Sequence, residues 1–259
     1  METIRIEVDR RGVASLILAR PEKHNALSAM MMAELSQAAE RLGRDPAVRV
    51  VVLRAEGESF CAGGDLGWMQ DQMRADSATR AREATKLARM LFLLNEMPKP
   101  LIGRIHGNAF GGGVGMASVC DVVIASEAAR FGLTETRLGL IPATIGPYVI
   151  SRLGEAMARR VFMSARLFDA AEAERLGLVA RVVAPEGLDA AVEAEVVPYL
   201  ACAPGAVAEA KRLTRRLGPP INDALIAETI SALVARWESD EAQEGIEAFF
   251  AKRKPIWNS

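Results

Sequence analysis

The sequence predicts an α/β protein. Stretches with the apolar pattern of buried strands alternate with stretches at helical spacing through the first half of the chain, and only helical patterns follow from about residue 190. Half of the 259 residues are of hydrophobic type. The chain can therefore bury one large core, with a smaller region appended to it.

The first half supplies the expected strands and the helices between them. IRIEVDRRGVASLILARP predicts a hairpin whose charged turn ends at Gly12, and SAMMMAELSQAAERLGRDP predicts a helix capped by Ser28. VRVVVLRAEG is apolar almost throughout, as expected of a strand that is covered on both faces. A helix over about residues 78–97, a strand at PLIGRIHG, a helix after the next glycine run and a strand at VVIAS continue the alternation.

The C-terminal part predicts three amphipathic helices. AVAEAKRLTRRL, DALIAETISALVARWES and EAQEGIEAFFAKRK each carry an apolar stripe. Three such helices cannot bury all their apolar surface against one another, so we expect them to pack on the first region or on a partner subunit. We divide the chain into a core over residues 1–195 and a helical oligomerisation region over residues 196–259.

Composition narrows the classes of function. The net charge of −1 gives no electrostatic case for binding nucleic acid or an anionic membrane surface. Three cysteines without paired spacing and only two histidines indicate neither a disulfide framework nor a metal site. The N-terminus lacks the apolar core of a signal peptide, and no run of about 18 apolar residues occurs. We expect a cytoplasmic protein.

Two glycine-rich loops, each before a helix, are the candidate chemical centres. They are SFCAGGDLGWM at residues 59–69 and NAFGGGVGMASVCD at residues 108–121. Both expose backbone N–H groups at a turn, where the start of a helix adds partial positive charge. Converging N–H groups can form an oxyanion hole for a thioester or ester carbonyl, or can cradle a phosphate, or can be tight turns that only allow close packing. Neither loop has the spacing of a dinucleotide or P-loop fingerprint.

Five segments, in order along the chain, resemble the enoyl-CoA hydratase/isomerase family, the crotonases. The segments are RPEKHNALS, FCAGGDL, GNAFGGGVGMASVCD, ARFGLTETRLGLIPATIGP and EGIEAFFAKRKPIW. The resemblance implies a crotonase-type spiral of ββα units with a C-terminal all-helical trimerisation region, assembled as a homotrimer or a dimer of trimers. It also implies an acyl-CoA thioester as the substrate. No cofactor or metal is expected beyond coenzyme A, which is part of that substrate.

The resemblance assigns roles to residues at matching positions. Ala62 and Gly112 match the residues whose backbone N–H groups hold the thioester oxygen, and Glu135 matches the acid that moves a proton at the carbon beside the thioester. The other matches lie where the family binds coenzyme A or borders the acyl group: Lys23, His24, Ala26, Ala62, Gly63, Gly64, Asp65, Leu66, Trp68 and Lys252. Core packing remains an alternative for Trp68, and a solvated basic face for Lys252.

Three further residues near these loops are interpreted as structural. Asp65 precedes a short helix and is expected to cap it. Cys61 has no histidine at a family base position, so a small buried residue is favoured over a nucleophile. His106 lies on an apolar strand, where a hydrogen-bonded structural histidine is favoured over a base.

Gly115 marks a departure from the hydratase pattern. Hydratases of the usual type carry a second glutamate three residues after the oxyanion glycine, and this chain has glycine there. The segments around Glu135 and GGDLGWM resemble bacterial methylglutaconyl-CoA and isohexenylglutaconyl-CoA hydratases of leucine and acyclic terpene breakdown. We therefore expect hydration of a carboxylated 2-enoyl-CoA, with the substrate carboxylate or a residue from elsewhere helping to place the water. The alternatives are a Δ3,Δ2-enoyl-CoA isomerase that uses Glu135 alone, and a non-catalytic CoA-binding scaffold.

Overall fold

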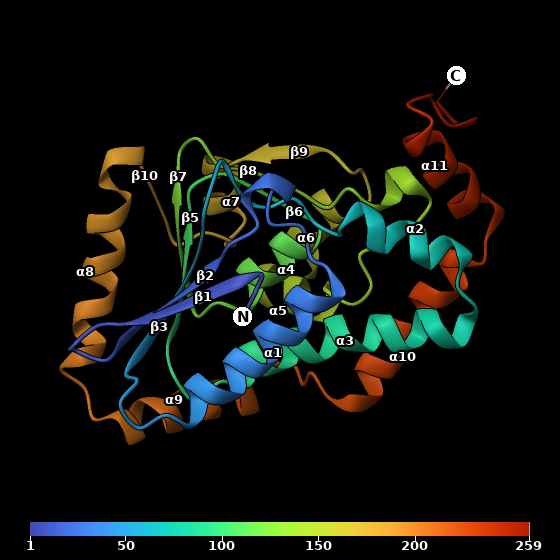
Figure 1. The fold of residues 1–259 in the computed structure, drawn as a ribbon. Helices are drawn as coiled ribbons and strands as arrows, with labels where there is room; N and C mark the ends of the chain where they lie inside the picture. Colours follow the sequence, from blue (N-terminus) through green and yellow to red (C-terminus); the bar gives the residue numbers. More distant parts are fainter. Residues whose placement is uncertain (259) are drawn as a thin grey trace.

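The structure is a computed structural model that describes residues 1–258, and it contains two sheets (Figure 1). The larger sheet has the order β1 (Ile4–Val8), β2 (Val13–Leu18), β3 (Val50–Ala55), β5 (Leu101–Ile105), β7 (Val122–Ser126), β10 (Arg181–Val183). β1 and β2 form the predicted antiparallel hairpin, and every later pair in this sheet is parallel. The strands predicted in VRVVVLRAEG, PLIGRIHG and VVIAS are thereby confirmed as β3, β5 and β7.

The smaller sheet consists of strands of three residues that the sequence pattern did not predict. Its order is β4 (Ser59–Cys61), β6 (Asn108–Phe110), β8 (Arg130–Gly132), β9 (Leu167–Asp169). Successive turns of the chain place one strand in the larger sheet, the next in the smaller sheet, and then a helix. The turns are β3–β4–α2 (Leu66–Arg74), β5–β6–α4 (Gly112–Val119) and β7–β8 followed by the 3₁₀ helix η2 (Glu135–Leu138) and α5 (Gly146–Leu153). The α/β spiral of ββα units is confirmed.

The remaining helices surround the two sheets. They are α1 (Ala29–Arg44), α3 (Ser77–Glu96), α6 (Glu155–Phe162), α7 (Ala170–Arg175), α8 (Leu188–Leu200), α9 (Pro204–Leu217), α10 (Asp223–Trp237) and α11 (Asp240–Phe250), with the 3₁₀ helices η1 (Pro21–Lys23) and η3 (Pro185–Gly187). The hydroxyl of Ser28 accepts a hydrogen bond from the N–H of Met31, which confirms the expected N-cap of α1. α3 matches the predicted helix over residues 78–97 within one residue at each end.

The central strands are apolar throughout because both faces of the larger sheet are covered. One face, which includes Val50 and Val52, packs against α8 through Leu188 and Val192. The other face, which includes Leu53, belongs to the main core that α1, α3 and α4 close. Figure 1 shows α8 alone on its side of this sheet. The division after residue 195 falls inside α8, a helix that this packing ties to the sheet.

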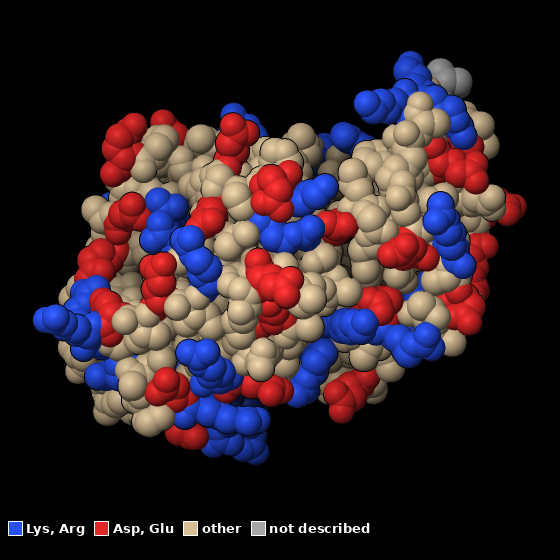
Figure 2. All heavy atoms as spheres, in the orientation of Figure 1, with Lys and Arg blue, Asp and Glu red and all other residues tan. Residues whose placement is uncertain are grey.

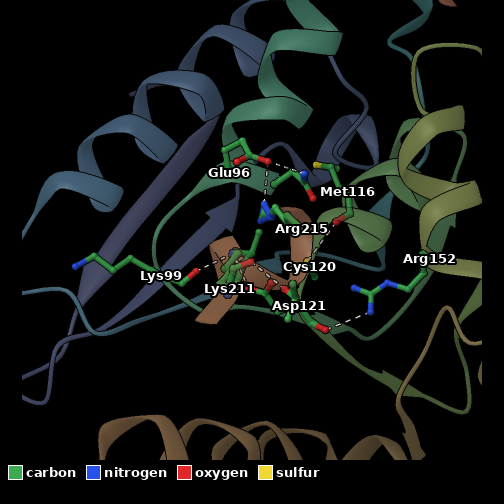
Figure 3. Close-up of polar contacts among 11 residues, drawn as sticks. Glu96, Lys99, Met116, Cys120, Asp121, Arg152, Lys211 and Arg215 are labelled. Carbon is green, nitrogen blue, oxygen red and sulfur yellow. Dashed lines mark hydrogen bonds and ion pairs between the residues drawn. The ribbon is translucent and has the colours of Figure 1, made fainter. Parts of the chain in front are cut away.

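The helix α9 is attached to the core by a partly buried ion pair (Figure 3). The ammonium of Lys211 lies 2.7 Å from a carboxylate oxygen of Asp121 and donates to the carbonyl of Lys99 at 2.9 Å. The same Asp121 oxygen accepts the N–H of Leu101 at 2.7 Å, so the pair joins α9 to the start of β5. The apolar side of α9 is otherwise unburied in this chain, as the 78% exposure of Leu217 shows.

Surface charge and hydropathy agree with the composition. On the face seen in Figure 2, acidic and basic side chains are interspersed, and no stripe of one sign crosses it. Among the helices of residues 1–258, none is by itself long and apolar enough to cross a membrane. The bent pair at residues 185–200 and 204–217 reaches that length and apolar composition only when its two helices are taken together.

Candidate active site

The two glycine loops meet at one point. They follow β4 and β6, which are parallel neighbours in the smaller sheet. Gly63 has φ of +96° and Gly111 has φ of +47°, conformations that favour glycine. A β-carbon placed on Gly111 would lie 3.8 Å from the α-carbon of Gly63, and one placed on Gly63 would lie 3.3 Å from the carbonyl oxygen of Phe110. The bare backbone therefore lets the two loops touch.

The backbone N–H of Ala62, which the resemblance assigns to the thioester oxygen, is already used within the fold. The N–H of Ala62 donates to the carbonyl of His24 at 3.0 Å, so it is not free to hold a thioester oxygen. The N–H of Gly64 has no acceptor among residues 1–258, and neither has the N–H of Gly112, which opens α4. The free donors at the junction are therefore those of Gly64 and Gly112, and Ala62 instead fixes the loop.

Glu135 places its carboxyl group beside this junction. It begins η2, separated from the end of β8 by two residues, and a β-carbon on Gly111 would lie 3.0 Å from its Oε1 atom. Its Oε2 atom is buried and has no hydrogen-bond partner within the described chain. Burial raises the pKa of Glu135 from 4.5 to about 7. The carboxyl group can therefore hold or release a proton near neutral pH, as a general acid or base requires.

Glu135 and both glycine loops line one cavity of about 420 Å³. Most of its wall is apolar and comes from α2, α3, η2, the loop before α5, and the C-terminal helices α10 and α11. The apolar side chains are Leu27, Met32, Ala62, Leu66, Met69, Leu87, Phe110, Leu138, Leu140, Ile141, Pro142, Ile145, Leu233, Trp237 and Phe249. Among the lining residues Glu135 is the only acid and Arg137 is the only cation.

The space beside Gly115 is filled by an isoleucine. A β-carbon on Gly115 would lie 2.5 Å from Cγ2 and 3.0 Å from Cβ of Ile145, closer than real side chains approach. Ile145 precedes α5, belongs to the core and also lines the cavity. The second carboxylate of the usual hydratase pattern is thus replaced by an apolar side chain that occupies its place.

The loop expected to border coenzyme A is held against the first glycine loop. Asn25 is fully buried, and its amide nitrogen donates to the carbonyls of Glu56 and Ser59, both at 2.8 Å. The N–H of Leu27 donates to the carbonyl of Gly63 at 2.7 Å. The structure therefore brings the Lys23–Ala26 segment beside the first glycine loop, which carries the free N–H group of Gly64.

The remaining predicted residues divide between the cavity wall and its surroundings. Ala62, Gly63, Gly64, Leu66 and Trp68 line the cavity, whereas Lys23, His24, Ala26, Asp65 and Lys252 do not. Asp65 caps α2 by accepting the N–H groups of Gly67 and Trp68, as predicted, and its other oxygen pairs with Arg20 at 3.1 Å. Lys252 is exposed just after α11, whose Phe249 reaches the cavity.

Cys61 and His106 lie outside the cavity wall. Cys61 is fully buried, and burial raises the pKa of its thiol to about 12, so the structural interpretation is confirmed. His106 shares a hydrogen bond of 2.8 Å with the carbonyl of Gly57, and burial lowers its pKa. Within residues 1–258, no group of three or more His, Cys, Asp or Glu side chains is arranged to hold a metal ion.

Comparison with known proteins identifies the family of the chain. A sequence model of the family described as enoyl-CoA hydratase/isomerase matches residues 9–259. A Rhizobium meliloti protein named "Probable enoyl-CoA hydratase" is 36% identical over 98% of this chain and 96% of its own length. The structure of an enoyl-CoA hydratase from Shewanella pealeana is 37% identical with a TM-score of 0.81, covering 99% of this chain and 96% of that chain. AtuE from Pseudomonas aeruginosa is 36% identical with a TM-score of 0.82 and full coverage of both chains. The chain belongs to the enoyl-CoA hydratase/isomerase family.

Proposed function

We propose that the protein hydrates a 2-enoyl-CoA thioester whose acyl group carries a second carboxylate, as 3-methylglutaconyl-CoA does. The observation that carries the proposal is the unpartnered carboxyl of Glu135 beside two free backbone N–H groups in an apolar cavity. Nothing in the packing requires an acid at this position, and burying one without a partner is unfavourable. The arrangement suits chemistry at the carbon next to a thioester.

The reaction follows from the positions of these groups. The thioester oxygen accepts hydrogen bonds from Gly64 and Gly112, which stabilise the negative charge that develops on it. The water oxygen bonds to the β-carbon, Glu135 delivers its proton to the α-carbon, and the proton that the water loses returns to Glu135. The net change is the addition of one water across the double bond.

Arg137 supports a carboxylated acyl group. It is the only cation among the residues that line the cavity, its side chain is exposed, and its guanidinium makes no hydrogen bond or ion pair with any residue of the described chain. A guanidinium fork binds a carboxylate through paired charge-assisted hydrogen bonds. A substrate with a second carboxylate would therefore give Arg137 the partner that this chain does not supply.

A panel of acyl-CoA substrates tests the proposal. We expect loss of the enoyl thioester absorbance with 3-methylglutaconyl-CoA and little turnover of crotonyl-CoA. Turnover of crotonyl-CoA that equals or exceeds that of the carboxylated substrate would contradict the proposed substrate class. Binding of acyl-CoA without any turnover would favour the alternative that the protein is a non-catalytic CoA-binding scaffold.

The role of Arg137 can be separated from binding of the coenzyme A phosphates. Arg137→Leu should raise KM for the carboxylated substrate by about tenfold or more and leave KM for crotonyl-CoA unchanged, whereas Arg137→Lys, which keeps the charge, should lose less. An equal rise in KM for both substrates would place Arg137 at the phosphates instead.

An isomerase is the second candidate, favoured by the single acid and by Ile145 in the place of the other. Moving a double bond from the 3- to the 2-position needs a proton shuttle between two carbons but no water. A 3-enoyl-CoA in the same panel separates the two activities. An isomerase converts it to a 2-enoyl-CoA, so the 2-enoyl absorbance rises, whereas a hydratase lowers that absorbance when it is given a 2-enoyl-CoA.

We also propose that the protein assembles as a trimer or a dimer of trimers through its C-terminal helices. The support is the unpartnered apolar side of α9, where Leu213 and Leu217 are 55% and 78% exposed. Light scattering of the purified protein tests this directly, since a monomer would contradict it.

A further inference from the structure

Hydration without a second carboxylate leaves the attacking water in need of another polar neighbour. Ile145 occupies the space beside Gly115, and Glu135 is the only acid of the cavity. One carboxyl group cannot both serve the α-carbon and fix a water over the β-carbon at a defined angle. In the proposed function Arg137 binds the second carboxylate of the substrate, so a side chain of the same cavity with a hydrogen-bonding group is the other candidate for placing the water.

The polar side chains of the cavity wall are few. Besides Glu135 they are Trp68, Trp237, Thr134, Arg137 and Thr144. The indole N–H of Trp68 already donates to Glu83 at 3.2 Å. Trp237 offers a donor only, so it cannot accept a hydrogen bond from the water. Arg137 only donates hydrogen bonds and is exposed to solvent, which suits an anion better than a reacting water. The two threonines remain.

Thr144 is the better placed of the two threonines. It is 5% exposed, lines the cavity, and its hydroxyl makes no hydrogen bond with any described residue. It directly precedes Ile145, the residue that fills the place of the missing acid. Thr134 is partly exposed and directly precedes Glu135, on the side of the site that already carries the acid.

We propose that the hydroxyl of Thr144 orients the attacking water, a role that rests on the proposed hydratase function. A threonine hydroxyl can accept one hydrogen bond and donate another, so it can fix a water without taking its proton. Thr144 is thus a positioning residue. The proton that the water loses still passes to Glu135, while the water oxygen bonds to the β-carbon.

The test compares two reactions of the same site. Hydration needs the water, whereas exchange of an α-proton of a saturated acyl-CoA in D₂O needs only Glu135 and the oxyanion donors. Thr144→Val keeps the shape of the side chain and removes the hydroxyl, and Thr144→Ser keeps the hydroxyl. We expect Thr144→Val to lower kcat for hydration about 10- to 100-fold with KM and α-proton exchange within about threefold of wild type. Thr144→Ser should restore most of the hydration rate.

Three outcomes would overturn the inference. Wild-type hydration by Thr144→Val would show that the hydroxyl is not needed. An equal loss of hydration and exchange would show that the substitution distorts the whole site. If the wild type exchanged α-protons normally but hydrated no 2-enoyl-CoA, the proposed hydratase function itself would be wrong. Because this result concerns the wild type, it is distinct from the two outcomes of Thr144→Val.

Discussion

Glu135 should destabilise the folded protein at neutral pH, and replacing it with glutamine should relieve the cost. Burial raises its pKa from 4.5 to about 7, so between these values the unfolded chain releases a proton that the folded chain keeps. The stabilising effect of this proton is complete below the unfolded pKa and is lost as the pH rises through the folded pKa. A shift of this size corresponds to about 3 kcal/mol once both states are ionised.

Urea unfolding of wild type and Glu135→Gln, at one fixed protein concentration, measures this effect. We expect the two proteins to have similar free energies of unfolding near pH 4.5, the unperturbed pKa of the carboxyl group. The advantage of Glu135→Gln should then grow with pH and level off at about 3 kcal/mol above about pH 7. Fixed concentration matters because assembly would add to the apparent stability.

Glu34 provides a control of opposite sign. Burial alone would raise its pKa, but hydrogen bonds from the Thr3 side chain and from the N–H groups of Glu2 and Thr3 lower it overall. Glu34→Gln should therefore be less stable than wild type at neutral pH, with the difference shrinking as the pH falls through the lowered pKa. If Glu135→Gln gave no advantage, or one independent of pH, the buried, unpaired state of Glu135 would be refuted.

The remaining predictions concern packing. Gly115→Ala should destabilise the fold by about 1–3 kcal/mol, because its β-carbon would lie 2.5 Å from Ile145. In a double-mutant cycle with Ile145→Ala, urea unfolding should show a favourable coupling above about 0.5 kcal/mol, and additive effects would contradict the contact. Lys211→Ala should cost about 2 kcal/mol in the same assay, because Asp121 loses its ion-pair partner and the carbonyl of Lys99 loses its donor. The exposed pair made by Arg212 is the control, and Arg212→Ala should change little.

Long, strongly patterned elements could be predicted from the sequence. The hairpin β1–β2, the strand β3 and the helix α3 follow from local periodicity and turn or cap residues. The three-residue strands of the smaller sheet could not be predicted, because three residues carry no readable period. Their pairing is set by the larger sheet, which brings the ends of successive turns side by side.

The site could be predicted to the level of its segments. The resemblance located both glycine loops and Glu135, which the fold brings together. The resemblance assigned the first donor to Ala62, two residues before Gly64. In the fold the N–H of Ala62 donates to the carbonyl of His24, which is distant in sequence, whereas the N–H of Gly64 is free. Backbone donors carry no side-chain signature, so only the folded contacts reveal which of them is free.

Residues that act through tertiary neighbours were also missed. Nothing in the local sequence shows that Ile145 fills the space beside Gly115, or that Thr144 lines the same cavity. In the sequence, the segment LIPATIGP is informative only as part of the resemblance. A glycine where an acid is expected is, in retrospect, the signal to ask which side chain takes its place.

The most direct test of the account measures the activity and the acyl-CoA affinity of Glu135→Gln together. We expect kcat with the best substrate of the panel to fall at least about 100-fold, because the amide cannot exchange a proton with the α-carbon. The Kd for acyl-CoA, measured by calorimetry, should stay within about threefold of wild type. Retained turnover in this variant would show that Glu135 is not the proton carrier.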